Sequence, residues 1–213
     1  MVVVLGTLGF RPETLIPTIR STKSLDKVVV FHSDHERSRG AATEVCALCE
    51  AMSVKFVDRE IPNAYDFIMV ARAIQDEILE IRGAGDNIWV FNIAGGTRIM
   101  SASALLVCTL EGLNAVYVHD NTMEEIPLPM LQIRYSDMLT DVQKKLLDHL
   151  LANKDRELTQ ADLSKELRMH KATINHHIKN LLEKGAVRLE TKKDDSREKV
   201  IRADESMELL LRR

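Results

Sequence analysis

The chain has 213 residues, of which 45% are hydrophobic and 29% are charged, and its formal net charge is −3. This composition excludes a disordered or collagen-like chain and is typical of a globular protein with a buried core. No apolar run reaches the roughly 18 residues of a membrane span, and the first residues lack the basic segment of a signal peptide. Three cysteines without secretory features fit a reducing compartment. We therefore expect a cytoplasmic protein with no membrane contact.

The first 135 residues alternate strand-like and helical segments. Five short runs rich in β-branched and aromatic residues have the length of strands: 1–5, 27–31, 54–57, 87–93 and 114–118. Their nearly continuous apolar character indicates burial on both faces, which is typical of parallel strands joined by helical crossovers. The pattern predicts an α/β domain at residues 1–135, with a doubly wound, mostly parallel, Rossmann-like sheet in the strand order 3-2-1-4-5.

Two local features of this domain are also predicted. Apolar residues recur at helical spacing from position 67 to position 81, and the pair Asn63 and Asp66 predicts that a capped helix begins there. Residues 131–135 alternate apolar and polar side chains, which predicts an additional strand at the edge of the sheet.

Residues 136–213 change to short helices joined by tight turns. Capping pairs that begin at Thr140 and Thr159 open two helices, and a third helix follows the turn at residues 168–170. Two alternating apolar runs further along the chain predict a hairpin. This order of elements predicts a small winged helix-turn-helix domain, in which the third helix enters the major groove of DNA.

The two predicted domains differ in charge. Residues 1–135 hold 12 Lys and Arg against 17 Asp and Glu, a net charge of −5, whereas residues 136–213 hold 17 against 15, a net charge of +2. Outward-facing polar residues of the third helix and the wing are suited to bases and phosphates. The predicted DNA-binding residues are Lys171, Thr173, Asn175, His176, Lys179, Lys192, Lys193, Arg197 and Lys199. A protein-interaction module whose basic residues only solvate the surface is the alternative.

The segment LTQADLSKELRMHKATINHHIKNLLEKGAV, residues 158–187, resembles the MarR-like and ArsR-like winged helix regulators. The resemblance extends over about 75 residues and implies that the domain binds DNA. That family usually has serine at the position of His170, where it caps the recognition helix. The cap, and one phosphate contact, are therefore expected to differ in this chain.

Two glycine-bearing loops follow the first and fourth predicted strands, at residues 6–10 and 95–98. Because these strands are neighbours whose crossovers leave to opposite faces, both loops are expected to line the crevice where such folds bind ligands. Glycine permits close backbone approach, the helix that follows Arg98 offers free N–H groups, and the guanidinium adds positive charge, so an anionic ligand is expected. The predicted effector-binding residues are Thr7, Leu8, Gly9, Phe10, Asn92, Ala94, Gly95, Gly96, Thr97 and Arg98.

The loops TLGF and NIAGGTR, together with the appended winged helix, resemble the CRISPR-associated Rossmann fold (CARF) regulators, especially the archaeal winged helix-turn-helix type. The resemblance implies a homodimeric regulator of CRISPR-associated genes, whose site lies across the two-fold axis and binds a cyclic oligoadenylate, commonly cyclic tetra-adenylate. It also implies that paired recognition helices meet palindromic double-stranded DNA. Neither of the two standard nucleotide-binding glycine loops is present, which argues against a dehydrogenase or a P-loop ATPase.

Two other functions stay open. Some CARF proteins cleave their cyclic ligand; here Arg98 could stabilise the developing charge, but its guanidinium is a poor proton acceptor. Thr7, Thr97 and His35 are the nearby residues that could assist, and no residue is assigned as catalytic. The other alternative is a winged helix repressor that answers a different small anion.

We expect no metal and no cofactor. Three pairs of residues have the spacing or the chemistry of half a metal site: Cys46 with Cys49, His32 with His35, and His176 with His177. None has a further ligand nearby in the sequence, so we interpret the cysteines as core residues and the segment at residues 32–35 as a polar loop at the edge of the ligand crevice.

Overall fold

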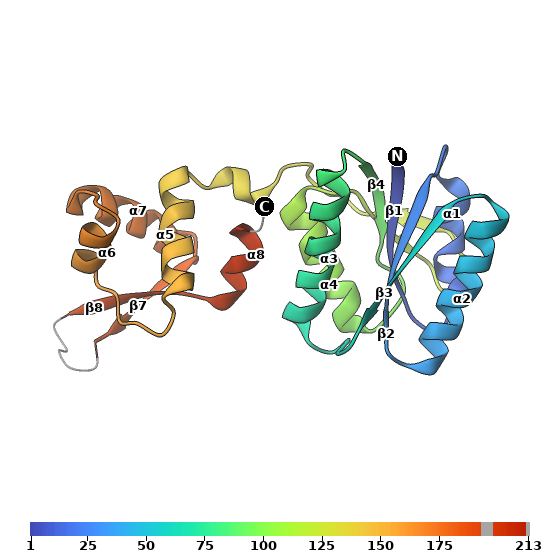
Figure 1. Ribbon diagram of the computed structural model, residues 1–213, viewed down its shortest axis with the longest axis horizontal. Helices are drawn as coiled ribbons and strands as arrows, with labels where there is room; N and C mark the ends of the chain where they lie inside the picture. The colour runs from blue at the N-terminus through green and yellow to red at the C-terminus, as the bar shows by residue number, and fades with distance from the viewer. Residues whose placement is uncertain (193–197, 212–213) are drawn as a thin grey trace. The chain divides into compact units, whose positions relative to one another are not determined.

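The computed structural model describes residues 1–192 and 198–211. It divides into two compact units, Met1–Tyr135 and Ser136–Arg213. Figure 1 shows the α/β unit and the smaller helical unit along the chain. Among the described residues, no helix combines the length and the apolar character needed to cross a membrane.

The first unit is built on a six-stranded sheet in the order β3-β2-β1-β4-β5-β6. The strands are β1 (Val2–Leu8), β2 (Lys27–Ser33), β3 (Lys55–Ile61), β4 (Asn87–Asn92), β5 (Ala115–Val118) and β6 (Glu125–Pro127). The first five run parallel and β6 is antiparallel to β5. The predicted Rossmann-like order is thus confirmed, and it places β1 beside β4 with their carboxyl ends at one edge.

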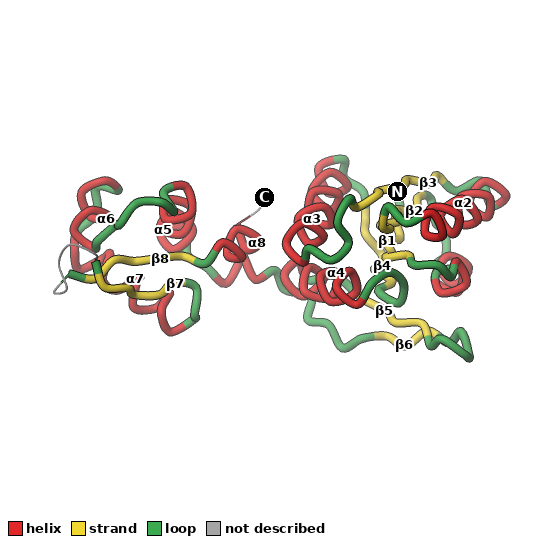
Figure 2. Tube along the Cα trace, turned by 90° about the horizontal axis from the view of Figure 1, so that it is seen from below, coloured by secondary structure: helices red, strands yellow, loops and turns green. Residues whose placement is uncertain are grey.

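Helices cover both faces of this sheet (Figure 2). Helices α1 (Ile16–Ser21) and α2 (Glu36–Ala51) lie on one face, and α3 (Phe67–Gly83) and α4 (Arg98–Glu111) lie on the other, where they pack against each other. The central strands β1 and β2 are almost entirely buried, because both of their faces are covered.

Two local predictions for this unit are wrong. Helix α3 is capped by Asp66, whose carboxylate accepts a hydrogen bond from the backbone of Met69, whereas the Asn63 side chain accepts one from the backbone of Tyr65 and shapes the preceding turn. The edge strand is Glu125–Pro127, and residues 131–134 form no strand. Prolines at 127 and 129 lack the N–H groups that would continue the pairing.

Residues 131–134 instead cross the end of helix α4. Gly112 follows that helix in the left-handed conformation, with φ of 63°. A β-carbon at Gly112 would lie 2.7 Å from the backbone nitrogen of Ile133, and the side chain of Gln132 donates to that of Asn114. The chain that leaves the sheet is therefore held against the carboxyl end of α4 by backbone contact that only glycine permits.

The second unit is a three-helix core with a two-stranded hairpin. The 3₁₀ turn Tyr135–Met138 spans the boundary between the units. The elements that follow it are α5 (Asp141–Ala152), α6 (Gln160–Glu166), α7 (Lys171–Glu183), β7 (Val187–Thr191), β8 (Lys199–Ala203), the 3₁₀ turn Glu205–Met207 and α8 (Glu208–Leu211). Both predicted capping boxes are present, at Thr140 with Gln143 and at Thr159 with Asp162. The apolar faces of the three helices share one buried cluster with β7 and β8, as a winged helix requires.

Candidate effector cavity and nucleic-acid surface

The two glycine turns at the ends of β1 and β4 lie in backbone contact. A β-carbon at Gly95 would lie 2.4 Å from the carbonyl oxygen of Thr7, and one at Gly9 would lie 2.9 Å from the nitrogen of Gly96. Real β-carbons do not approach other atoms so closely, so glycine is required at both positions. The fold therefore brings residues separated by almost ninety positions into one continuous floor.

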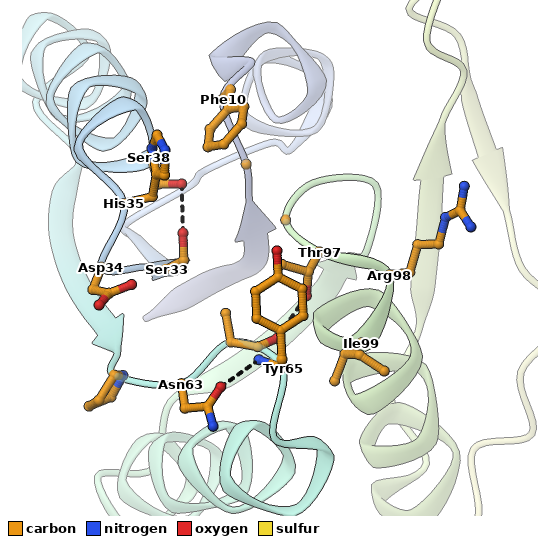
Figure 3. A pocket seen from close by; sticks show the side chains of 14 residues that line it. Phe10, Ser33, Asp34, His35, Ser38, Asn63, Tyr65, Thr97, Arg98 and Ile99 are labelled. Atoms are coloured by element: carbon orange, nitrogen blue, oxygen red, sulfur yellow. Dashed lines mark hydrogen bonds between the residues drawn. The ribbon is translucent and has the colours of Figure 1, made fainter.

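An open cavity of about 520 Å³ lies over this floor, at the carboxyl edge of the sheet. Figure 3 shows the side chains around it, which come from the ends of β1 and β2, the loop before α3 and the start of α4. The lining residues are Gly9, Phe10, Ser33, Asp34, His35, Ser38, Pro62, Asn63, Ala64, Tyr65, Gly96, Thr97, Arg98 and Ile99. The volume lies within the range of small-molecule sites in proteins.

The N-terminus of α4 opens at the cavity. The hydroxyl of Thr97 caps the helix by accepting a hydrogen bond from the backbone of Met100, at 3.1 Å, and donates to the carbonyl of Ala64, at 2.8 Å. The backbone N–H groups of Arg98 and Ile99, in the first turn, have no carbonyl partner within the helix. Together with the helix dipole they form a favourable environment for an anion.

Arg98 adds positive charge beside this helix end. Its side chain is exposed, and it forms no ion pair within the described part of the chain. Figure 3 shows the guanidinium at the start of α4 directed away from Tyr65 and Asn63. Arg98 is thus free to meet a group that approaches the outside of the helix.

Several predicted effector-binding residues do not line the cavity. Thr7, Leu8 and Asn92 have no exposed surface, and Gly95 is buried. The Asn92 amide donates to the carbonyl of Thr14 and accepts from the backbone of Ala94, so it fixes the turn from below. In this structure these residues lie inside the sheet that supports the floor and do not line the cavity.

The structure adds lining residues that the sequence prediction missed. Ser33, Asp34 and His35 belong to the segment 32–35, which was expected at the edge of the crevice, whereas Ser38 of α2 and the loop 62–65 after β3 were not predicted. The strand order could have predicted that these residues lie at the cavity, because the carboxyl ends of parallel strands meet at the same edge of the sheet. Of the residues named as possible aids to catalysis, His35 lines the cavity, whereas Thr7 is buried and the Thr97 hydroxyl is engaged in capping.

The paired residues that resembled metal sites have other contacts. His32 is buried with Nε2 2.5 Å from Asp58, whereas His35 caps α2 by accepting from the backbone of Arg37. Burial raises the pKa of Cys49 to about 11, so its thiol is a core group. Within residues 1–192 and 198–211, no three His, Cys, Asp or Glu side chains form a group that could hold a metal ion.

In the second unit, α7 has the expected two faces. Ile174, Ile178 and Leu181 are buried, whereas the predicted DNA-facing residues of this helix are all exposed: Lys171, Thr173, Asn175, His176 and Lys179. The helix begins after His170, whose side chain makes no capping hydrogen bond, as expected from the departure at this position. The first N–H groups of α7 therefore stay open to a phosphate.

The wing carries part of the predicted charge. Lys199 is exposed, whereas Lys192 is half-buried and pairs with Glu198 at 2.6 Å, which raises the pKa of its ammonium group. This pairing offsets the positive charge that Lys192 was expected to offer to DNA. Lys193 and Arg197 lie outside the described residues.

A Rossmann-like domain with a cavity at its switch point, joined to a winged helix, defines the class of ligand-sensing DNA-binding regulators. Residues 2–129 match the family model of the Csa3 CRISPR-associated Rossmann-like domain, and residues 139–198 match that of the MarR family. The chain belongs to the Csa3 CRISPR-associated Rossmann-like family, and its C-terminal domain is a MarR-family winged helix.

Three solved structures illustrate the likeness. Protein VC1899 from Vibrio cholerae has 13% sequence identity and a TM-score of 0.52, over 92% of this chain and 63% of that one, and supports the fold. Can2 from Sulfobacillus thermosulfidooxidans in complex with cyclic tetra-adenylate has 15% identity and a TM-score of 0.49, over 99% and 64%. The S. aureus MepR–DNA complex has 27% identity and a TM-score of 0.32, over 34% and 54%.

The chain thus matches between 54% and 64% of the length of these three proteins. The last two superpose only weakly on this chain. A comparison with curated proteins finds no match.

Proposed function

We propose that this protein is a homodimeric transcriptional regulator of CRISPR-associated genes that binds a cyclic oligoadenylate, most favourably cyclic tetra-adenylate. The observation that carries the proposal is the cavity over the two abutting glycine turns, into which the N-terminus of α4 opens. Phosphodiester groups are the anions that such a helix end binds well. Membership of the Csa3 family supports a CRISPR-associated role for this sensor.

The proposed ligand is shared between two protomers. A cavity of about 520 Å³ suits a drug-sized molecule, and a ring of four nucleotides is larger than that. Arg98, Ala102 and Leu105 recur along one exposed face of α4, which leads away from the cavity and suits contact with a second copy. A two-fold axis beside this face would bring two cavities and two Arg98 side chains to one symmetric ring.

The winged helix is proposed to bind a palindromic operator through α7. Its exposed Lys171 and Lys179 supply phosphate contacts, while Asn175 can pair with adenine in the major groove. The uncapped start of α7 offers a further position for a backbone phosphate. Effector binding is proposed to change DNA affinity by favouring one spacing of the two recognition helices.

Calorimetry with cyclic tri-, tetra- and hexa-adenylate tests the proposal directly. We expect the tetra-adenylate to bind at one ring per dimer, and the Arg98→Ala substitution to weaken that binding at least tenfold, because it removes a charge-assisted contact. Arg20→Ala is the matched control, since Arg20 is also an exposed arginine of the sensor unit but does not line the cavity. The Arg98→Ala protein should keep its effector-free DNA affinity.

Three outcomes would contradict the proposal. They are a monomeric mass in light scattering with and without ligand, no heat with any of the rings, and equal affinity of the wild type and Arg98→Ala. Chromatography of the ligand after hours of incubation reports separately whether the ring is cleaved.

A further inference from the structure

We infer that Tyr65 is the side chain on which a base of the effector stacks, an inference that rests on the proposed function. Tyr65 lines the cavity, and its 77% exposure exceeds that of every other large hydrophobic side chain in the described part of the chain. Burial of an aromatic ring is favourable because it removes apolar surface from water, and a ring exposed in a cavity obtains this free energy only when a ligand covers it. A purine base has the shape and the π-face to do so.

The backbone that carries Tyr65 is held at three points. Its N–H donates to the side chain of Asn63, at 3.1 Å, and the carbonyl of Ala64 accepts from the Thr97 hydroxyl, at 2.8 Å. The next residue, Asp66, caps α3. The ring is thus presented from a rigid loop, so stacking on it orders only the side chain and loses little conformational entropy.

The other aromatic ring of the cavity is already in use. Phe10 has the guanidinium of Arg37 over its face, at 4.5 Å, and the imidazole of His35 at 4.7 Å between ring centroids. Tyr65, in contrast, takes part in no ring or cation contact of this kind among the described residues, and its hydroxyl forms no hydrogen bond there. Of the two rings, Tyr65 is the one that is free to receive a base.

The position of Tyr65 also fits a nucleotide. The Thr97 hydroxyl joins the loop of Tyr65 to the first turn of α4, where the free N–H groups lie. In the view of Figure 3 the ring overlaps Thr97, and both residues line the cavity. A phosphate at the helix end therefore places the attached sugar and base within reach of the ring, and two Tyr65 rings in a dimer would hold two bases of one cyclic ligand.

Binding of cyclic tetra-adenylate to three variants tests the inference. Tyr65→Ala should weaken binding by about tenfold or more, since the base loses the aromatic ring on which it stacks. Tyr65→Phe should bind within about threefold of the wild type, because its ring can still stack. Tyr135→Ala is the matched control, as Tyr135 is exposed but lies outside the cavity.

A spectroscopic signal separates stacking from a structural role. In a Trp89→Phe background, which removes the one tryptophan of the chain, the ligand should quench tyrosine emission. The added Tyr65→Phe change should keep the affinity and abolish most of the quenching. Full affinity of Tyr65→Ala, or quenching that persists without Tyr65, would overturn the inference.

The proposed function and this inference fail in different ways. If the wild type binds none of the cyclic rings, both are wrong. If the wild type binds the tetra-adenylate and Arg98→Ala does not, while Tyr65→Ala binds normally, only the role of Tyr65 is wrong.

Discussion

At Gly95 a single hydrogen atom in place of a side chain decides whether the floor of the cavity can form. We expect Gly95→Ala to destabilise the protein by about 1–3 kcal/mol, because the added methyl group would meet the backbone of Thr7 and Leu8, which cannot move aside. Gly40 is the control, since it lies inside α2 with nothing within 4 Å of a β-carbon. Gly40→Ala should stabilise by about 0.5–1 kcal/mol. Urea denaturation of both variants measures the contrast, and effects of the same sign would contradict it.

Individual site residues were only partly predictable from the sequence. Gly9, Gly96 and Thr97 could be placed at the cavity because they directly follow strands whose order the apolar pattern predicts. The direction of the Asn92 side chain could not be predicted, since a residue at the end of a strand points either into the layer beneath or toward the cavity; in the structure it bonds to Thr14 and Thr18. Tyr65 was missed although its loop follows β3 at the carboxyl edge of the sheet. The hydrogen bond from the Thr97 hydroxyl to the carbonyl of Ala64, which holds this loop at the cavity, spans more than thirty positions and leaves no local pattern in the sequence.

Among the helices, α6 depends on a charged cap. The carboxylate of Asp162 accepts hydrogen bonds from the backbone and the hydroxyl of Thr159, at 2.9 and 2.7 Å, and these bonds hold the pKa of Asp162 below its ordinary value. A lowered pKa in the folded state stabilises the protein fully above the unfolded carboxyl pKa of about 3.9, and this contribution is lost as the pH falls through the folded value.

Asp162→Asn should therefore lower the free energy of unfolding by about 1 kcal/mol at pH 7, the usual effect of a weakened cap. The difference from the wild type should shrink in urea denaturation as the pH falls from about 5 to 3. Asp148→Asn is the control, since Asp148 is an exposed acid of α5 that forms no ion pair or side-chain hydrogen bond in the described chain. A difference that stays constant with pH would show that the charge does not matter.

Elements were predicted best where a pattern repeats within them. Strands and amphipathic helices were predicted from the spacing of their apolar residues, which recur with a period of about two or 3.6. The capping boxes at Thr140 and Thr159 correctly predicted where two helices begin. The start of α3 was predicted too early because Asn63 and Asp66 are both residue types that cap helices. The structure shows that the side chain of Asp66 accepts the capping hydrogen bond. The false edge strand at 131–135 alternates correctly but has no neighbour to pair with.

For the whole molecule, the charge difference between the units predicts how binding depends on salt. We expect Lys171→Ala with Lys179→Ala to weaken operator binding and to reduce the slope of log affinity against log salt by about 2, one for each lost phosphate contact. Lys23→Ala with Lys55→Ala is the control, because it removes the same charge from exposed lysines of the sensor unit. Fluorescence anisotropy with labelled operator DNA at several salt concentrations measures both slopes.

A slope that changes equally in both double variants would mean that only total charge matters, rather than the face of α7. Binding of cyclic tetra-adenylate should be the same in all of these proteins, since none of the four lysines lines the cavity. The sequence could predict both units and their order, but not how a ligand in one affects the other.

Helix α4 begins at the cavity and ends at Gly112, where Ile133 rests on its last turn. Its middle is tied to α3 through the Ser103 hydroxyl, which donates to the carbonyl of Phe67. Since a helix is stiff along its axis, we expect a tilt that a ligand imposes on the first turn of α4 to shift its last turn as well. The backbone at Ile133 would then move with it, because Gly112 has no side chain to separate the two segments.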